Sequence, residues 1–203
     1  MVEQIRIGLK RLGIETSPST PGELKLPGLE DVKSDRAIRI WSGLEAKKSS
    51  ALNAPFVEIQ TVSEREWASL SYPEEARTVE ASVLKSSFAH IYPPGVMDRA
   101  EPGTGKRPAL RSLEGRWTIS PAGSDGKARY AVLAGKARLT YGPDGFSYEG
   151  DFEAVIAYTA NDPSARTLLG VFEAVYPRTA GRMERRSAAQ VPFAAVLETL
   201  TKP

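Results

Sequence analysis

Two nearly identical six-residue phrases in the second half of the chain constrain its fold most strongly. They are Gly150–Val155 (GDFEAV) and Gly170–Val175 (GVFEAV), and the segment Asn161–Ser164 (NDPS) lies between them. Asparagine, aspartate, proline and serine all favour turns. The two phrases are therefore predicted to face each other across a long hairpin, which indicates a β-rich fold.

A second turn signal precedes the first phrase. In the segment 141–146 (YGPDGF), proline and glycine occupy positions that suit a tight turn. This predicts paired strands at 128–141 and 146–159, with Tyr141 opposite Phe146.

The repeat itself predicts the next strand, at 166–177, with Phe152 directly opposite Phe172. A last strand is predicted at 190–200, where side chains alternate between apolar and small or polar types. Because this segment contains Pro192, which has no backbone N–H, we expect it at an edge of the sheet.

Alternation along these strands predicts which side chains share a face. Gly135 is predicted to lie opposite Phe152, whose ring can cover a position that has no side chain. One face collects aromatic and aliphatic side chains and is predicted to be the core: Leu133, Leu139, Tyr141, Phe146, Tyr148, Phe152, Ile156, Leu168, Phe172 and Tyr176.

The opposite face is divided along its length. One end carries charged residues, whereas the other carries the apolar residues Val132, Val155 and Leu169. Apolar side chains in such a row are normally covered by another layer. We therefore expect part of residues 30–92 to pack on this face.

The first half of the chain carries weaker patterns. The segments 37–42 and 56–62 alternate between apolar and polar residues and are predicted to be strands. Ser63 and Glu66 have the spacing of a capping box, which predicts a short helix. The segment 79–92 fits either a helix or a strand.

These predictions combine into a mainly β fold with a minor α component. We expect an antiparallel meander that forms a strongly coiled sheet, a sandwich or a partly open barrel, with one or two short helices in the N-terminal half. Residues 1–28 are predicted to be an arm or connector, and 29–203 a single β-rich domain. Within this domain, residues 29–92 would pack across the meander 113–200. The loop 93–112 would join these two parts.

Charge and composition narrow the functional classes. The chain has 27 lysines and arginines against 25 acidic residues, a net charge of +2, which is too small to recruit nucleic acid or a membrane surface. It contains no run of about 18 apolar residues, so no membrane insertion is predicted. The absence of cysteine excludes thiol chemistry and leaves the compartment open between the cytoplasm and export with a signal removed.

A group of acidic residues shares one face of the predicted meander. Convergent carboxylates are the ligands that calcium prefers, so Asp151, Glu153 and Glu173 form a candidate metal site. Arg138 is predicted to stand opposite Glu149 on this face and Lys136 opposite Asp151, which favours surface ion pairs instead. No other cofactor is expected.

No residue set indicates a catalytic centre. His90 is the only histidine, and its apolar neighbours favour a structural role. The segment 103–106 (GTGK) lacks the first glycine and the hydroxyl residue of a phosphate-binding loop. The arginines of segment 178–186 lack the interleaved aromatic residues that are typical of nucleic-acid sites.

The segment 115–117 (GRW) is similar to the G-x-W motif that opens the first strand of lipocalin-like barrels. The resemblance covers these three residues and implies barrel geometry for the strands that follow. Positions 118–203 are too few for eight comparable strands, so a barrel would need strands from the first half.

Three functional hypotheses follow. The leading one is a non-enzymatic, β-rich binding or protein-interaction module with a protein partner or a second copy of the chain. The first alternative is a carrier of an apolar small molecule or lipid, and the second is a carboxylate-dependent hydrolase. The carrier would use the aromatic side chains of the predicted core face: Tyr141, Phe146, Tyr148, Phe152, Phe172 and Tyr176.

Overall fold

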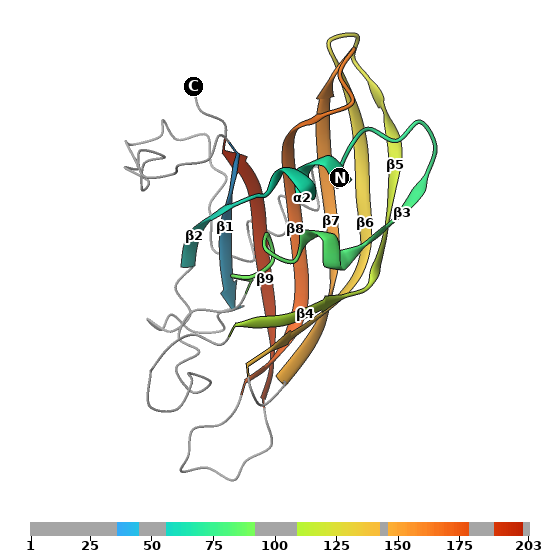
Figure 1. The fold of residues 1–203 in the computed structure, drawn as a ribbon. Helices are drawn as coiled ribbons and strands as arrows, with labels where there is room; N and C mark the ends of the chain where they lie inside the picture. The colour runs from blue at the N-terminus through green and yellow to red at the C-terminus, as the bar shows by residue number, and fades with distance from the viewer. Residues whose placement is uncertain (1–35, 45–55, 92–108, 143–145, 179–188, 201–203) are drawn as a thin grey trace, which may run out of the picture.

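The computed structural model describes residues 36–44, 56–91, 109–142, 146–178 and 189–200, and the structural findings concern these residues. They form one antiparallel sheet of nine strands that is not closed into a barrel (Figure 1). The predicted mainly β, antiparallel fold with a minor helical part is thereby confirmed. The strands are β1 (Ala37–Leu44), β2 (Phe56–Thr61), β3 (Arg77–Glu80), β4 (Leu110–Glu114), β5 (Arg116–Ser124), β6 (Ala128–Tyr141), β7 (Phe146–Thr159), β8 (Ala165–Arg178) and β9 (Ala189–Leu200).

The strands lie in the order β2-β1-β9-β8-β7-β6-β5-β3, and β4 also pairs with β6. The prediction of an edge position for the last strand is wrong, because β9 lies between β8 and β1. Pro192 is tolerated there because the pairing of β1 with β9 ends at Leu44 and Phe193. Among the described residues none pairs with β9 on that side beyond this pair, so the only described ladder at Pro192 is the one with β8, where it pairs with Val175.

The predicted registers of the long hairpins are confirmed. Tyr141 pairs with Phe146 at the first turn, and Phe152 pairs with Phe172 in the repeat. One irregularity occurs near the second turn, where the register shifts so that Tyr158 pairs with Ala165.

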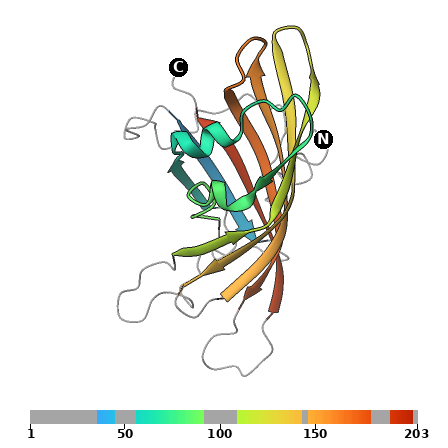
Figure 2. The ribbon, with the colours of Figure 1, turned by 45° about the vertical axis from the view of Figure 1, so that its right-hand side comes forward.

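One segment of the first half crosses the concave face of the sheet (Figure 2). This crossing segment, residues 62–91, follows the edge strand β2 and begins with the helix α2 (Glu64–Ser69). It then reaches the opposite edge of the sheet as β3, and continues into the short 3-10 helix η3 (Ala81–Leu84). The segment 79–92, for which the sequence left two readings open, therefore begins as the end of a strand and turns into a 3-10 helix.

The crossing segment packs on the aromatic face of the meander. The ring of Phe88 lies edge-on to Phe152, at 5.0 Å between centroids, and to Phe172, at 5.9 Å. The expectation that residues 30–92 cover the opposite face is therefore wrong for this segment. Burying the larger aromatic surface removes more apolar area from water.

Tyrosine hydroxyls tie the crossing segment to the sheet. The hydroxyl of Tyr158 donates to the carbonyl of Leu70 at 2.7 Å, and that of Tyr141 donates to the carbonyl of Ile91 at 2.7 Å. From the other side, the indole Nε1 of Trp67 donates to the carbonyl of Ala165 at 2.5 Å. These bonds satisfy buried backbone acceptors at the end of α2 (Leu70), after η3 (Ile91) and at the start of β8 (Ala165).

The glycines around the core make room for aromatic rings. A Cβ atom at Gly170 would lie 2.9 Å from Cε2 of Phe152, and one at Gly150 would lie 2.5 Å from Cζ of Phe172. Each copy of the repeat thus supplies the glycine over which the phenylalanine of the other copy lies. Gly135 does lie opposite Phe152, but the ring nearest to a Cβ atom there would be that of Trp117, at 2.8 Å from its Cδ1 atom.

Candidate functional site

The aromatic side chains that the carrier hypothesis invoked are packed against other side chains. Tyr141, Tyr148, Phe152, Phe172 and Tyr176 are all buried, and they belong to one hydrophobic cluster that includes residues of the crossing segment. The side chain of Phe146 lies outside the described residues. The five described rings therefore form part of a packed core.

The other side of the sheet, which we call the outer face, carries a partly exposed apolar surface. On β7 and β8 its side chains alternate with those of the core, as the pleat requires. Val155 pairs with Val132 on one side and with Leu169 on the other. In the next row, Val171 pairs with Val196 of β9.

This surface extends to the first strand. Val196 pairs with Trp41 of β1, and the partly buried Trp41 packs against a small cluster of Val171, Ala194 and Val196. The sequence predicts apolar residues on this face, but their link to β1 depends on the pairing of β1 with β9, which local patterns do not reveal.

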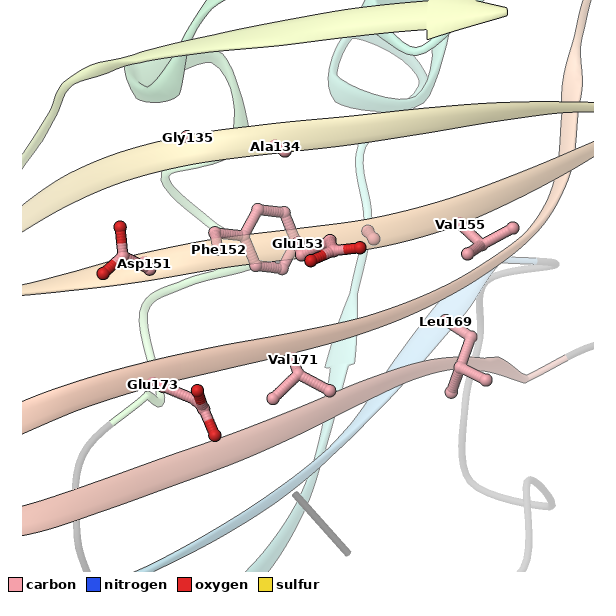
Figure 3. A pocket seen from close by; sticks show the side chains of 10 residues that line it. Ala134, Gly135, Asp151, Phe152, Glu153, Val155, Leu169, Val171 and Glu173 are labelled. Carbon is pink, nitrogen blue, oxygen red and sulfur yellow. The ribbon is translucent and has the colours of Figure 1, made fainter. Parts of the chain in front are cut away.

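A pocket of about 290 Å³ lies on the outer face (Figure 3). Val155 and Leu169 line one end of it, and the carboxylates of Asp151 and Glu173 lie at the other end. Glu153 projects from β7 in the middle, near Val171. The pocket thus combines an aliphatic surface with acidic groups.

Two apolar side chains of this face are exposed to water. Leu169 has 37% of its surface accessible, and Val175, farther along β8, has 49%. Both are large hydrophobic residues on one strand. Of the two, Leu169 lines the pocket beside Val155 and Val171, and exposed apolar surface grouped in this way is typical of sites that bind another molecule.

The cross-strand ion pairs predicted on this face are present. Lys136 lies 3.8 Å from Asp151, and Arg138 lies 3.4 Å from Glu149. All four side chains are well exposed, so these pairs add little to stability.

Glu153 differs from these acids. Its direct neighbours across the sheet are Ala134 on β6 and Val171 on β8, so no cation stands opposite it. Within the described part of the chain it makes no ion pair. It is thus an exposed carboxylate flanked by apolar side chains.

The candidate metal ligands lie on one face, and Asp151 pairs with Glu173 as expected. Nevertheless, no three histidine or acidic side chains of the described ranges are grouped so that they could hold a metal ion. The calcium hypothesis gains no structural support.

The one buried acidic side chain in the described ranges, Glu66, has a structural role. Its carboxylate accepts five hydrogen bonds, two from Ser63, one from Ser86 and two from Ser87. Burial raises the pKa of Glu66, but the hydrogen bonds from these serines outweigh it and hold the pKa below its ordinary value. The capping box is confirmed, and the same carboxylate also fixes the turn that follows η3.

The single histidine also has a partner. Nδ1 of His90 lies 2.5 Å from the carboxylate of Glu58 on the edge strand β2. This contact joins the end of the crossing segment to the sheet edge, which agrees with a structural role. The segment 103–106 and the side chains of the arginines in 178–186 lie outside the described residues.

Trp117, from the segment that is similar to the lipocalin motif, is fully buried against Phe88 and Phe152. The adjacent Gly115 separates β4 from β5, which pair with successive parts of β6. A Cβ atom at Gly115 would overlap the carbonyl oxygen of Lys136. The motif therefore marks a sharp bend in a sheet that stays open.

Comparisons of the chain with protein-family models, curated proteins and solved structures gave no match. Within the described ranges, no helix has the length and apolar character needed to span a membrane.

Proposed function

We propose that this chain is a non-enzymatic binding module and that its outer face binds a partner protein. The observation that carries this proposal is the partly exposed aliphatic surface around Val155, Leu169 and Val171 on the outer face. A partner that covers this surface is held by the hydrophobic effect. The complex gains about 25 cal/mol of stability for each square ångström of apolar area removed from water.

The distribution of polar groups supports a binding role rather than catalysis. The buried carboxylate of Glu66 is held by hydrogen bonds from serines, and His90 contacts Glu58. Both side chains thus have structural roles. The acids that do line the pocket on the outer face, Asp151, Glu153 and Glu173, lie together on one side of the sheet, whereas acid–base catalysis by carboxylates needs two of them in unlike environments.

Site-specific photo-cross-linking in the cells that produce the protein tests the proposal. A photoreactive phenylalanine analogue at Leu169 should give a discrete cross-linked product with another protein. The same group at Ser124, at the far end of β5, should not. Addition of Val155→Asp should reduce the Leu169 product, because Val155 lines the same pocket and pairs with Leu169, and a charge there opposes apolar contact.

Equal cross-linking from both positions would overturn the proposed surface. Reproducible turnover of a substrate by the purified chain, lost in a single-residue variant, would overturn the non-enzymatic role.

A further inference from the structure

We infer that the outer face recognises a segment of a partner protein in which a lysine or arginine stands among aliphatic side chains. This inference rests on the proposed function and adds the chemistry of the partner. The central residue is Glu153, which lies among the apolar residues of the pocket.

The position of Glu153 makes its charge decisive once a partner binds. Ala134 and Val171 flank it in register, and Val155 and Leu169 line the same pocket. A partner that covers these aliphatic groups also removes water from the carboxylate. A carboxylate that loses water without a new partner is costly, so a purely apolar partner is disfavoured.

A basic side chain removes this penalty. A lysine or arginine can place its charged end on Glu153, while its methylene stem packs on the neighbouring Val171. Asp151 at the end of the pocket already pairs with Lys136, so Glu153 supplies the charge that favours this partner. The face therefore suits a segment with basic and aliphatic side chains together.

The same charges disfavour other occupants. In a symmetric dimer whose two-fold axis passes through this pocket, Glu153 of one copy would lie near Glu153 of the other, which costs free energy. Nucleic acid and anionic membrane surfaces carry negative charge as well. A basic protein segment is the occupant that fits both the apolar and the acidic parts.

Titration of the full chain with synthetic helical peptides tests the inference. One peptide consists of leucine and lysine, a second of leucine and glutamine, and a third of leucine and glutamate. Calorimetry and the fluorescence change from Trp41, which packs beside the pocket, report binding. We expect the lysine peptide to bind more tightly than the glutamine peptide, and the glutamate peptide not to bind.

Two variants assign the contributions. Glu153→Gln should weaken binding of the lysine peptide roughly tenfold, the effect of one charge-assisted contact, and leave the glutamine peptide unchanged. Leu169→Gln should weaken both peptides. Glu149→Gln is the matched control, because Glu149 lies on the same face but pairs with Arg138 outside the pocket; it should change neither. Circular dichroism checks that each variant is folded.

The outcomes separate the two proposals. Equal binding of the lysine and glutamine peptides, with no effect of Glu153→Gln but a loss in Leu169→Gln, would overturn the basic partner and leave the apolar surface standing. Absence of binding by all three peptides would overturn the recognition inferred here, and the cross-linking at Leu169 would then decide the proposed function independently. A dimer in sedimentation that Leu169→Gln dissociates would show a second copy as the occupant and would also overturn the inference.

Discussion

The ring of Phe152 lies over Gly170 so closely that a methyl group at residue 170 would come within 2.9 Å of the ring carbon Cε2. The same relationship holds in the other direction between Phe172 and Gly150. The two copies of the repeated phrase are therefore complementary: each provides a ring and a space for a ring. This explains why the glycine and the phenylalanine occur together in both.

Gly150→Ala should destabilise the protein more than Gly170→Ala. At Gly150 the new methyl group would meet the backbone carbonyl of Glu173 as well as the ring of Phe172, and backbone cannot move aside. We expect a loss of about 1–3 kcal/mol in the free energy of unfolding for Gly150→Ala. At Gly170 the nearest atoms are side-chain atoms that can shift, so the loss should be smaller. Urea denaturation measures both, with Thr167→Ala on the exposed side of β8 as control; a larger effect at Gly170 would contradict this account.

Tyr158→Phe tests the attachment of the crossing segment. The hydroxyl of Tyr158 is buried and donates to the carbonyl of Leu70 at 2.7 Å. Its removal leaves that carbonyl without a donor, which should lower the free energy of unfolding by about 1–3 kcal/mol. Tyr130→Phe is the matched control, because the Tyr130 hydroxyl bonds to Asp125 at an exposed site. Equal unfolding free energies for wild type and Tyr158→Phe would show that the bond contributes nothing.

The same tyrosine should resist ionisation. Desolvation by burial raises the pKa of Tyr158 well above its ordinary value. A group with a raised pKa in the folded state contributes stability below its unfolded pKa, and this contribution is lost as the pH rises above about 10. Ultraviolet titration near pH 10 should give the same tyrosinate absorbance for folded wild type and folded Tyr158→Phe, because Tyr158 stays protonated there, whereas after alkaline unfolding wild type should give more. Complete tyrosine ionisation in the folded state near pH 10 would disprove this.

Glu66→Gln should make the free energy of unfolding less dependent on pH in acidic solution. The pKa of Glu66 is lower in the folded state than in the unfolded state. Its ionised carboxylate therefore stabilises the fold at pH values above the ordinary pKa of a carboxyl group. This stabilisation is lost as the pH falls through that pKa and below it. Near neutral pH we expect Glu66→Gln to cost about 1–3 kcal/mol. The difference between wild type and variant should shrink as the pH falls below about 4.

Unfolding free energies measured from neutral to acidic pH test this dependence. The exposed Glu64 at the start of the same helix provides the control variant Glu64→Gln, which should behave like wild type. A difference between wild type and Glu66→Gln that stays constant with pH would contradict the assignment.

Phe88→Ala probes the contact between the crossing segment and the aromatic core. Phe88 contacts Trp117, Phe152 and Phe172, and its removal should cost about 3–5 kcal/mol. The cavity left behind should bind a small apolar probe such as benzene, detectable as a rise in melting temperature of the variant that wild type does not show. Binding of benzene by wild type at the same concentration would indicate a void in the native core and would revive the carrier hypothesis.

The long hairpins were predictable because two local signals agree there. Tyr141 and Phe146 flank a turn with suitable proline and glycine residues, and alternation on both sides allows one register. Pro192 was misleading because its sequence neighbourhood does not reveal where β1 ends. From the sequence alone, a proline in an inner strand cannot be distinguished from a proline in an edge strand unless the length of the neighbouring strand is known.

The arrangement of the first half depended on contacts between distant residues. The capping box of Ser63 and Glu66 could be read from spacing, but the bonds of Glu66 to Ser86 and Ser87 arise only after η3 folds back. Likewise, both faces of β7 carry apolar residues, so alternation alone cannot say which face the crossing segment covers. The isolated position of Glu153 on the outer face depends on its partners in β6 and β8.

The pairing of β1 with β9 also governs the order of events during synthesis. Trp41 and Glu198 approach each other across 157 positions of the chain. On a ribosome, β1 emerges long before β9, so one edge of β1 has no partner until nearly all of the described sheet has been made. Free strand edges invite pairing with other chains. The nascent protein should therefore depend on chaperones or on rapid translation at this stage, and its β1–β2 hairpin is the part that they would need to shield.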